Sequence, residues 1–328
     1  MVKLSSFFKS SPATIVMLLC GVPICLFAIA CNETAMKFKL QHQQVLHGVP
    51  SASGVVQLDS SLYVVGDNTA WLYKLNDRYD VIGKELLVEH LTDSILPKIS
   101  KPDFEAMTIW EIHGKKEILI FGSGSKSPER NTMVRVRFLD SVQRSVHDIA
   151  GFYEALLQTE QMEGQDLNIE AAATVEDQLY LFNRERNIVW RISLPGFLNY
   201  VETSGQLPSI ETYHLKLPLH KALQIKISGA SNVLGASQLV FVASVEDTPN
   251  TYDDGEVLGS YVGIIDLDAL TDGYQPPCIP ILDATAQLPI KVESVEVLKA
   301  IDEHRLKLVM VSDSDGGDSE VLVGELEW

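Results

Sequence analysis

The sequence predicts an all-β fold, a single five-bladed β-propeller of four-stranded blades. Short runs of Val, Ile, Leu and aromatic residues, bounded by Gly, Asp, Asn and Ser, occur along most of the 328 residues, which is typical of β-strands joined by turns. One pattern recurs five times: an apolar strand, a polar turn, a second strand such as LYVV or LYLF, a polar loop and a third strand. The copies begin near residues 53, 105, 170, 231 and 293, and these spacings suit propeller blades.

Each blade needs a fourth strand, and weaker apolar segments supply it. In the first four copies these segments are residues 81–89, 145–152, 210–218 and 278–284. The fifth copy ends at Trp328 directly after its third strand, so we expect residues 36–46 to complete its sheet and to close the ring without an open edge. Six blades are the alternative, but no segment remains for a sixth. Residues 151–159 are the only stretch with a helical pattern.

The composition excludes several classes of protein. With 46% hydrophobic and 21% charged residues, the chain is globular and neither disordered nor collagen-like. Its formal net charge is −18 and it contains no basic run. Affinity for phosphate backbones depends on clustered Lys and Arg, so we expect no nucleic-acid partner.

The first 30 residues predict export. Lys3 and Lys9 precede an uncharged apolar stretch over residues 14–30, as in a secretory signal peptide. Ala28 and Ala30 before Cys31 resemble a bacterial lipoprotein processing site, in which the cysteine is lipidated. An uncleaved membrane anchor is the alternative, but 17 apolar residues interrupted by a proline are short for crossing a bilayer.

This interpretation divides the chain into a signal peptide over residues 1–30, a lipidated tether over 31–35 and the propeller over 36–328. We expect a monomer in the bacterial cell envelope that contacts the membrane through its N-terminal lipid only. Cys278 would be the one cysteine of the exported domain outside the tether, so no intrachain disulfide is expected.

The residues that open the five copies are candidates for a metal site. The first strand of a propeller blade lines the central axis, so these residues should converge there; they are Ser53, Glu105, Glu170, Ser231 and Glu293. In the fourth copy Ser228 competes with Ser231. Oxygen ligands without His or Cys favour Ca²⁺, which accepts irregular geometry, over Mg²⁺ or zinc. Alternatively, the glutamates cap backbone amides or pair with arginines, for which Arg130, Arg184 and Arg186 are available.

A second ring of polar residues follows the second strand of each copy. Its members are Asp67, Ser123, Ser125, Arg184, Arg186, Glu246, Asp247, Asp313 and Asp315. Carboxylates and arginines around a cation suit a small anionic or polyhydroxyl ligand. If the protein is a catalyst, Asp67 or Asp313 would position water and Arg184 or Arg186 would stabilise anionic charge. Ser123, Ser125, Arg130, Asp247 and Asp315 would form the ligand rim.

Several segments together resemble an uncharacterised family of exported bacterial propeller proteins, a domain of unknown function. They are KPDFEAM (101–107), FGSGS (121–125), NIEAAA (168–173), SVED followed by GSYVGIIDL, and KVES (291–294). The resemblance covers nearly the whole chain after the leader. It implies the propeller fold and brings no activity.

More distantly, the order Ser, Glu, Glu, Ser, Glu at the copy starts resembles that of calcium-dependent apyrases, five-bladed propellers with an axial Ca²⁺. On that resemblance the five residues would be calcium ligands, and GDNTA around Asp67 stands where the apyrases have DDRTG. Half of that segment differs. Esterase-like phytase and lactonase-type propellers have similar Glu-containing strand starts, which again implies the ion rather than the substrate.

Two functional hypotheses follow. The preferred one is a non-catalytic envelope propeller that binds calcium on its axis and a small ligand or protein partner on the same face. The alternative is a calcium-dependent hydrolase of phosphate esters, such as nucleotides or phytate, or of lactones. No general base stands out in the sequence, so whether the protein is an enzyme stays open.

Overall fold

The computed structural model describes residues 35–112, 114–247, 255–283, 286–313 and 318–328. Residues 35–328 form one compact unit. In the described part of the chain, no helix combines the length and the apolar character needed to cross a membrane. The predicted signal peptide, tether and Cys31 lie outside the described residues.

Five four-stranded antiparallel sheets make up the fold, and we number them as blades 1 to 5. Blade 1 contains β2 (Ala52–Leu58), β3 (Ser61–Gly66), β4 (Trp71–Leu75) and β5 (Val81–Leu86). Blade 2 contains β6 (Phe104–Ile112), β7 (Lys115–Gly122), β8 (Thr132–Phe138) and β9 (Val142–Asp148). Blade 3 contains β10 (Ile169–Val175), β11 (Gln178–Asn183), β12 (Ile188–Ser193) and β13 (Ile210–His214).

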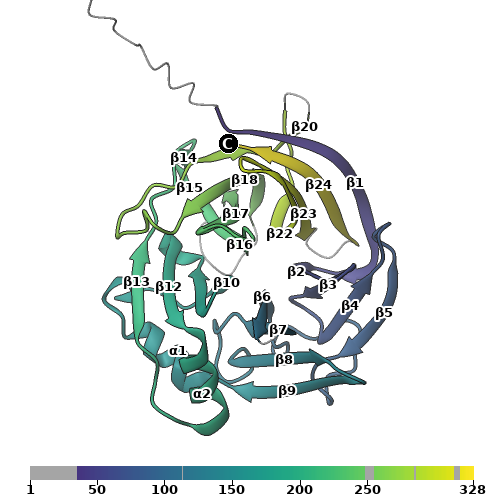
Figure 1. The fold of residues 1–328 in the computed structure, drawn as a ribbon, viewed down its shortest axis with the longest axis vertical. Coiled ribbons are helices and arrows are strands. Elements are labelled where there is room, and N and C mark those ends of the chain that lie inside the picture. Colours follow the sequence, from purple (N-terminus) through teal and green to yellow (C-terminus); the bar gives the residue numbers. More distant parts are fainter. Residues whose placement is uncertain (1–34, 113, 248–254, 284–285, 314–317) are drawn as a thin grey trace, which may run out of the picture. The chain divides into compact units, whose positions relative to one another are not determined.

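Blade 4 contains β16 (Lys226–Asn232), β17 (Gln238–Asp247), β18 (Glu256–Asp266) and β19 (Cys278–Pro280). Blade 5 contains β22 (Lys291–Asp302), β23 (Arg305–Asp313), β24 (Asp318–Glu327) and β1 (Lys37–Pro50). The inner strands β2, β6, β10, β16 and β22 contact one another in turn around the centre (Figure 1). The predicted five-bladed propeller is therefore confirmed.

The two ends of this unit share the sheet of blade 5, as predicted. Strand β1 pairs with β24 along nearly its whole length, with Lys37 opposite Glu327 and Leu46 opposite Ser319. Backbone hydrogen bonds between the first and last strands thus close the ring, and β1 covers the outer edge of β24 in blade 5.

The hydrophobic core is divided into five clusters, one between each pair of neighbouring blades. In β7, for example, Ile118 and Ile120 pack toward blade 1, whereas Leu119 and Phe121 pack toward blade 3. Successive side chains of a strand point to opposite faces, and here both faces are buried. This explains why the second strand of each copy is an uninterrupted apolar run.

Two helices lie beside blade 3. Helix α1 (Ala150–Leu157) occupies the predicted helical stretch. Helix α2 (Leu194–Thr203) was not expected from the sequence. It begins at Ser193, whose side chain accepts a hydrogen bond from the Gly196 amide, and a proline stands in its first turn. Phe152 of α1 and Phe197 of α2 pack with ring centroids 4.7 Å apart, which holds the helices together.

Candidate functional site

A β-bulge at the start of each inner strand positions the candidate residues. Opposite the second strand, the register shifts by one residue, and the extra residue is Ser53, Glu105, Glu170, Ser228 or Glu293 in blades 1 to 5. A bulge leaves its extra residue outside the ladder and redirects its side chain. The five bulge residues therefore occupy equivalent positions, at the starts of the five inner strands.

The placement of Ser231 in this set was wrong. The bulge of β16 lies between Ile227 and Gly229, so Ser228 is the equivalent residue. Ser231 lies three residues further along the strand and donates a hydrogen bond to Glu296 at 2.8 Å. Apolar periodicity locates a strand, but it does not locate a bulge within the strand.

The two serines of the set join neighbouring blades. The Ser53 hydroxyl donates to the backbone carbonyl of Phe104 at 2.5 Å, and the Ser228 hydroxyl donates to that of Val292 at 2.6 Å. Each acceptor is the residue directly before the bulge of the next blade. The same contact thus recurs at two blade junctions, and the hydroxyl hydrogens are used in it.

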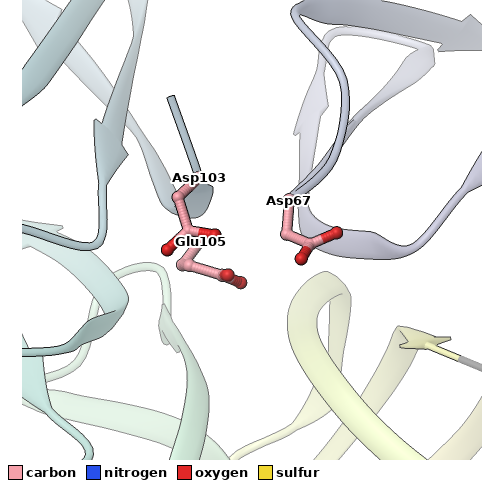
Figure 2. Close-up of side chains that lie close together, drawn as sticks. All are labelled: Asp67, Asp103 and Glu105. Carbon is pink, nitrogen blue, oxygen red and sulfur yellow. The ribbon is translucent and has the colours of Figure 1, made fainter. Parts of the chain in front are cut away.

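Asp67, Asp103 and Glu105 form a group that we call the acidic cluster (Figure 2). One carboxylate oxygen from each lies within 4.8 Å of the others. Asp103 and Glu105 come from the start of β6, and Asp67 faces them from the loop after β3. Asp103 has a φ of 56°, a left-handed conformation that aspartate tolerates better than most residues.

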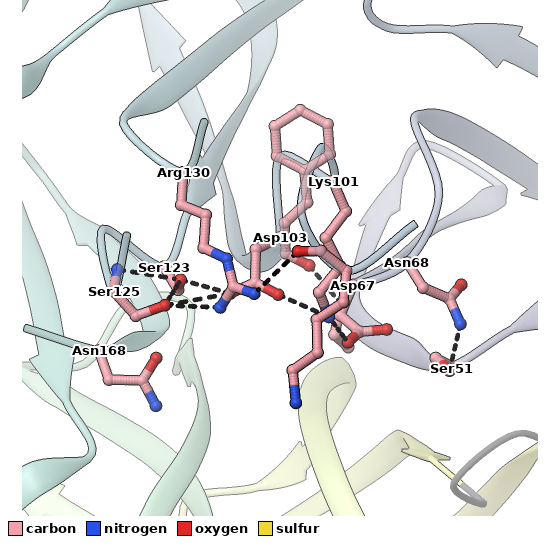
Figure 3. Close-up of polar contacts among 12 residues, drawn as sticks. Ser51, Asp67, Asn68, Lys101, Asp103, Ser123, Ser125, Arg130 and Asn168 are labelled. Atoms are coloured by element: carbon pink, nitrogen blue, oxygen red, sulfur yellow. Dashed lines mark hydrogen bonds and ion pairs between the residues drawn. The ribbon is translucent and has the colours of Figure 1, made fainter. Parts of the chain in front are cut away.

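Two basic side chains balance part of the acidic cluster. The Lys101 ammonium pairs with Asp67 and lies 2.7 Å from Asp103, and Arg130 lies 2.6 Å from Asp103 (Figure 3). Ser123 donates to the Asp103 carboxylate at 2.5 Å. Burial opposes the charge of Lys101, but the carboxylates of Asp103 and Asp67 raise its pKa overall. Both oxygens of Asp103 therefore have cationic or hydroxyl partners.

Glu105 differs from its neighbours because no lysine or arginine of the described structure forms an ion pair with it. Within the described residues its carboxylate has neither an ion pair nor a hydrogen bond. Burial raises the pKa of Glu105 well above its ordinary value, and the charges of Asp103, Glu170 and Asp67 raise it further. The Oδ1 atom of Asp67 is also buried without a partner among these residues.

A second group, which we call the bridging network, continues around the axis. Arg184 lies between Glu170 at 3.3 Å and Glu246 at 2.6 Å. Lys291 lies between Glu246 at 3.2 Å and Glu293 at 2.9 Å. The two cations thus form ion pairs with three carboxylates. For Glu170, the predicted alternative of a glutamate paired with an arginine is confirmed.

Burial and the two cations shift the pKa values of this network in opposite directions. Burial raises the pKa of Glu170 to about 7, although the Arg184 charge opposes the shift. Burial also disfavours the charge of Glu246, but Arg184 and Lys291 outweigh it and lower the pKa of Glu246. One oxygen of Glu293, Oε2, is buried without a partner in the described structure.

Some of the predicted rim residues gather at the site. Ser125 lies 2.8 Å from Ser123 and 2.7 Å from Arg130, and all three surround Asp103. Arg184 belongs to the bridging network.

Of the other predicted rim residues within the described structure, two are exposed and one stands beside the bridging network. Arg186 is exposed, and its charge helps to lower the pKa of His214 on the outer strand of blade 3, after burial of that histidine. Asp247 is exposed at the end of β17, and Asp313 pairs in register with Lys291. Asp315 lies outside the described residues. Arg186 therefore does not lie with the charged residues near the axis, although its position after the second strand of its copy predicted this.

Four residues of the site were missed in the sequence: Lys101, Asp103, Asn168 and Lys291. The last three stand two positions before the bulge residues Glu105, Glu170 and Glu293, and Asn168 donates to Glu170 at 2.6 Å. A polar residue recurring two positions before each glutamate was a usable signal. Lys101 lies in a connection between blades and has no equivalent in the repeat.

The residues fit a hard divalent cation at the acidic cluster better than at a five-residue axial ring. Ca²⁺ binds carboxylate oxygens without demanding a fixed geometry. The buried, unpartnered Oδ1 of Asp67 and the unpaired Glu105 carboxylate supply such oxygens. Ser53 is engaged with a backbone carbonyl, and Glu170 is engaged with Arg184 and Asn168.

A family model described as a family of unknown function (DUF6929) matches residues 48–326. The search of curated proteins found no match.

Among solved structures, the glutaminyl cyclase of Myxococcus xanthus is 9% identical, over 88% of this chain and 96% of that chain, with a TM-score of 0.49. The tail fibre of Staphylococcus aureus phage P68 is 11% identical, over 89% and 53%, with a TM-score of 0.45. The α-L-arabinanase of Cellvibrio cellulosa in complex with arabinohexaose is 11% identical, over 88% and 93%, with a TM-score of 0.41. Similarity at this level carries no information on activity.

Proposed function

The chain belongs to this family of unknown function (DUF6929), and we propose that it binds Ca²⁺ at the acidic cluster and a small anionic or polyhydroxyl ligand on the same face. From residues 1–31 we propose that the propeller is exported and lipid-anchored. Asp67 and Glu105 would hold the ion, with Asp103 beside them. The role would be that of a binding protein, because the described carboxylates of the site other than Glu105 are held in ion pairs with lysines and arginines.

The unpaired Glu105 is the observation that carries this proposal. Asp67, Asp103, Glu170, Glu246 and Glu293 each have a Lys or Arg within 4.0 Å. Glu105 has none within the described structure, yet it lies beside two other carboxylates. A desolvated carboxylate next to like charges is unfavourable unless it is protonated or binds a cation.

A bound Ca²⁺ would supply positive charge that attracts an anionic oxygen of a ligand. Lys101 and Arg130 lie next to the same carboxylates and would add charge-assisted hydrogen bonds to such a ligand. Ser125 adds a hydroxyl at the edge of the cluster. These side chains favour ligands with carboxylate, phosphate or hydroxyl groups.

Calcium titration of the purified full-length protein by isothermal calorimetry tests the ion site. We expect saturable binding that Glu105→Gln weakens by at least about tenfold, since one charged ligand is lost. Glu154→Gln, an exposed glutamate on α1, is the matched control and should bind like the wild type. Lys101→Met should bind calcium more tightly, because it removes the cation that competes for Asp67 and Asp103.

Equal affinity of the wild type and Glu105→Gln, or no binding by the wild type, would refute calcium binding at this cluster. The same protein, assayed with calcium against nucleotides, phytate and lactones, should show no turnover. Calcium-dependent hydrolysis would instead make the protein an enzyme and refute the binding-protein proposal.

The envelope location rests on Cys31 and is tested separately. Cys31→Ser should release the protein from the membrane fraction of a bacterial host, whereas Cys25→Ser, within the proposed leader, should leave it membrane-bound. Membrane association that is unchanged in Cys31→Ser would contradict the lipid anchor.

A further inference from the structure

A groove of about 290 Å³ lies between blades 5 and 1, at the end of the inner strands opposite the acidic cluster. On β2 the groove residue Gln57 follows the bulge residue Ser53 by four positions, which corresponds to about 13 Å along an extended strand. On β22 the groove residues Leu298 and Lys299 likewise follow Glu293. The groove is therefore separate from the proposed calcium site.

The groove exists because the apolar core of this junction ends there. On β23, Val309 and Val311 face blade 1 and are fully buried in the cluster between blades 5 and 1. Two residues before Val309 on the same face stands Lys307, which lines the groove. Successive residues of one parity share a strand face, so a lysine occupies the position where the pattern would place another core residue.

Two lysines stand side by side on the blade 5 wall of this groove. Lys299 of β22 is directly opposite Lys307 of β23 in the ladder. Like charges in this position repel. Neither lysine lies within 4.0 Å of an acidic side chain of the described structure, although Glu325 pairs in register with Lys307 on the other side and Asp77 lines the groove.

The rest of the lining suits a small hydroxyl-rich molecule. The side-chain amide of Gln57 and the hydroxyl of Ser60 form no hydrogen bond with other described residues, so both are available to a ligand. Leu62, Leu298 and Tyr79 supply apolar surface.

One wall of the groove is a fixed turn. Asn76 Oδ1 accepts hydrogen bonds from the Arg78 and Asp80 amides, each at 2.9 Å. Such a wall is formed before a ligand arrives, which reduces the entropy lost on binding.

We propose that this groove binds a small, hydroxyl-rich anion of monosaccharide size through Lys299 and Lys307. The two ammonium groups would contact the carboxylate or phosphate of the ligand, Gln57 and Ser60 its hydroxyls, and Tyr79 its carbon face. A few convergent polar groups on an apolar lining are the usual composition of a small-molecule site.

Binding of glucuronate, glucose 6-phosphate and glucose to the purified full-length protein tests this inference by calorimetry, without added calcium. We expect one or both acidic sugars to bind and glucose to bind at least about tenfold more weakly. Lys299→Gln combined with Lys307→Gln should abolish binding of the acid and should not lower the melting temperature, because it removes a repulsion. Lys39→Gln, an exposed lysine of the same blade, is the matched control and should bind as the wild type does.

A preference between glucuronate and glucose 6-phosphate would identify the acidic group. Absence of binding by both acids, equal binding of glucose, or unchanged binding by the double variant would overturn the proposal. Because Glu105→Gln leaves the groove intact, loss of calcium binding and loss of sugar binding are separate results.

Discussion

Charged side chains inside the ring are costly individually, and most are balanced by a neighbour. Arg184 and Lys291 alternate with three glutamates, and Lys101 lies between two aspartates. Breaking one buried pair leaves an uncompensated charge, which typically costs several kcal/mol. The pairs therefore fix the positions of side chains at the site, and Glu105, which has no such pair among the described residues, is the carboxyl group left to bind a cation.

Glu296 lies deeper along the axis and predicts a dependence of stability on pH. Its carboxylate accepts hydrogen bonds from the Ser231 hydroxyl and the backbone amide of Gln57, but burial outweighs them and raises the pKa of Glu296 to about 7. The unfolded chain releases this proton near 4.5, the ordinary value. The contribution of Glu296 to the free energy of unfolding is therefore fully present below pH 4.5. It is lost as the pH rises through 7, which lowers the free energy of unfolding by up to about 3 kcal/mol.

Glu296→Gln should remove this loss. Compared with the wild type in urea denaturation, the variant should have similar stability at pH 5 and greater stability at pH 8. A variant that is equally destabilised at both pH values would show that the charge of Glu296 is stabilised by the fold.

At the scale of elements, the bulge is the unit that repeats most regularly. In blades 1 and 4 the bulge serine bonds to the residue before the next bulge, so each contact links two inner strands. We predict that Ser228→Ala lowers the free energy of unfolding by about 1–3 kcal/mol, because the Val292 carbonyl loses a buried partner. Ser237→Ala, at an exposed hydroxyl, is the control and should change stability by less than about 0.5 kcal/mol. Equal effects of the two variants on chemical denaturation would exclude this role.

The elements themselves could be predicted because apolar runs and turn residues are local signals. The closing strand followed from the same reasoning, since an unmatched last blade needs a partner. The first residue of the fourth copy was placed at Ser231 instead of the competing Ser228, because pairing register depends on the neighbouring strand, which periodicity does not describe. Helix α2 was missed although Ser193 and the following proline mark its start.

The acidic cluster was only partly predictable for a similar reason. Glu105 and Asp67 occupy repeat positions and were identified. Lys101 and Arg130 come from connections that differ between blades, so their ion pairs depend on the folded loops. Asp103 stands before the first residue of its repeat, and its left-handed backbone conformation is not apparent from apolar periodicity.

At the scale of the whole molecule, the junction of blades 5 and 1 joins the two ends of the propeller. Leu46 of β1 is 1% exposed and packs in the cluster between these blades, whereas its neighbour Val45 is 41% exposed. Leu46→Ala should lower the free energy of unfolding by about 2–5 kcal/mol through a cavity at the closure. Val45→Ala should have a much smaller effect. Similar losses for both, measured by thermal denaturation, would show that β1 does not close a packed core.

The central claim is that the acidic cluster holds a cation, and a crystal structure of the protein grown with calcium tests it most directly. We predict an anomalous scattering peak from a calcium ion whose distances to the Asp67 and Glu105 oxygens are about 2.3–2.6 Å. Crystals that show the Lys101 ammonium between Asp67 and Asp103, with no anomalous peak near Glu105 at saturating calcium, would contradict it.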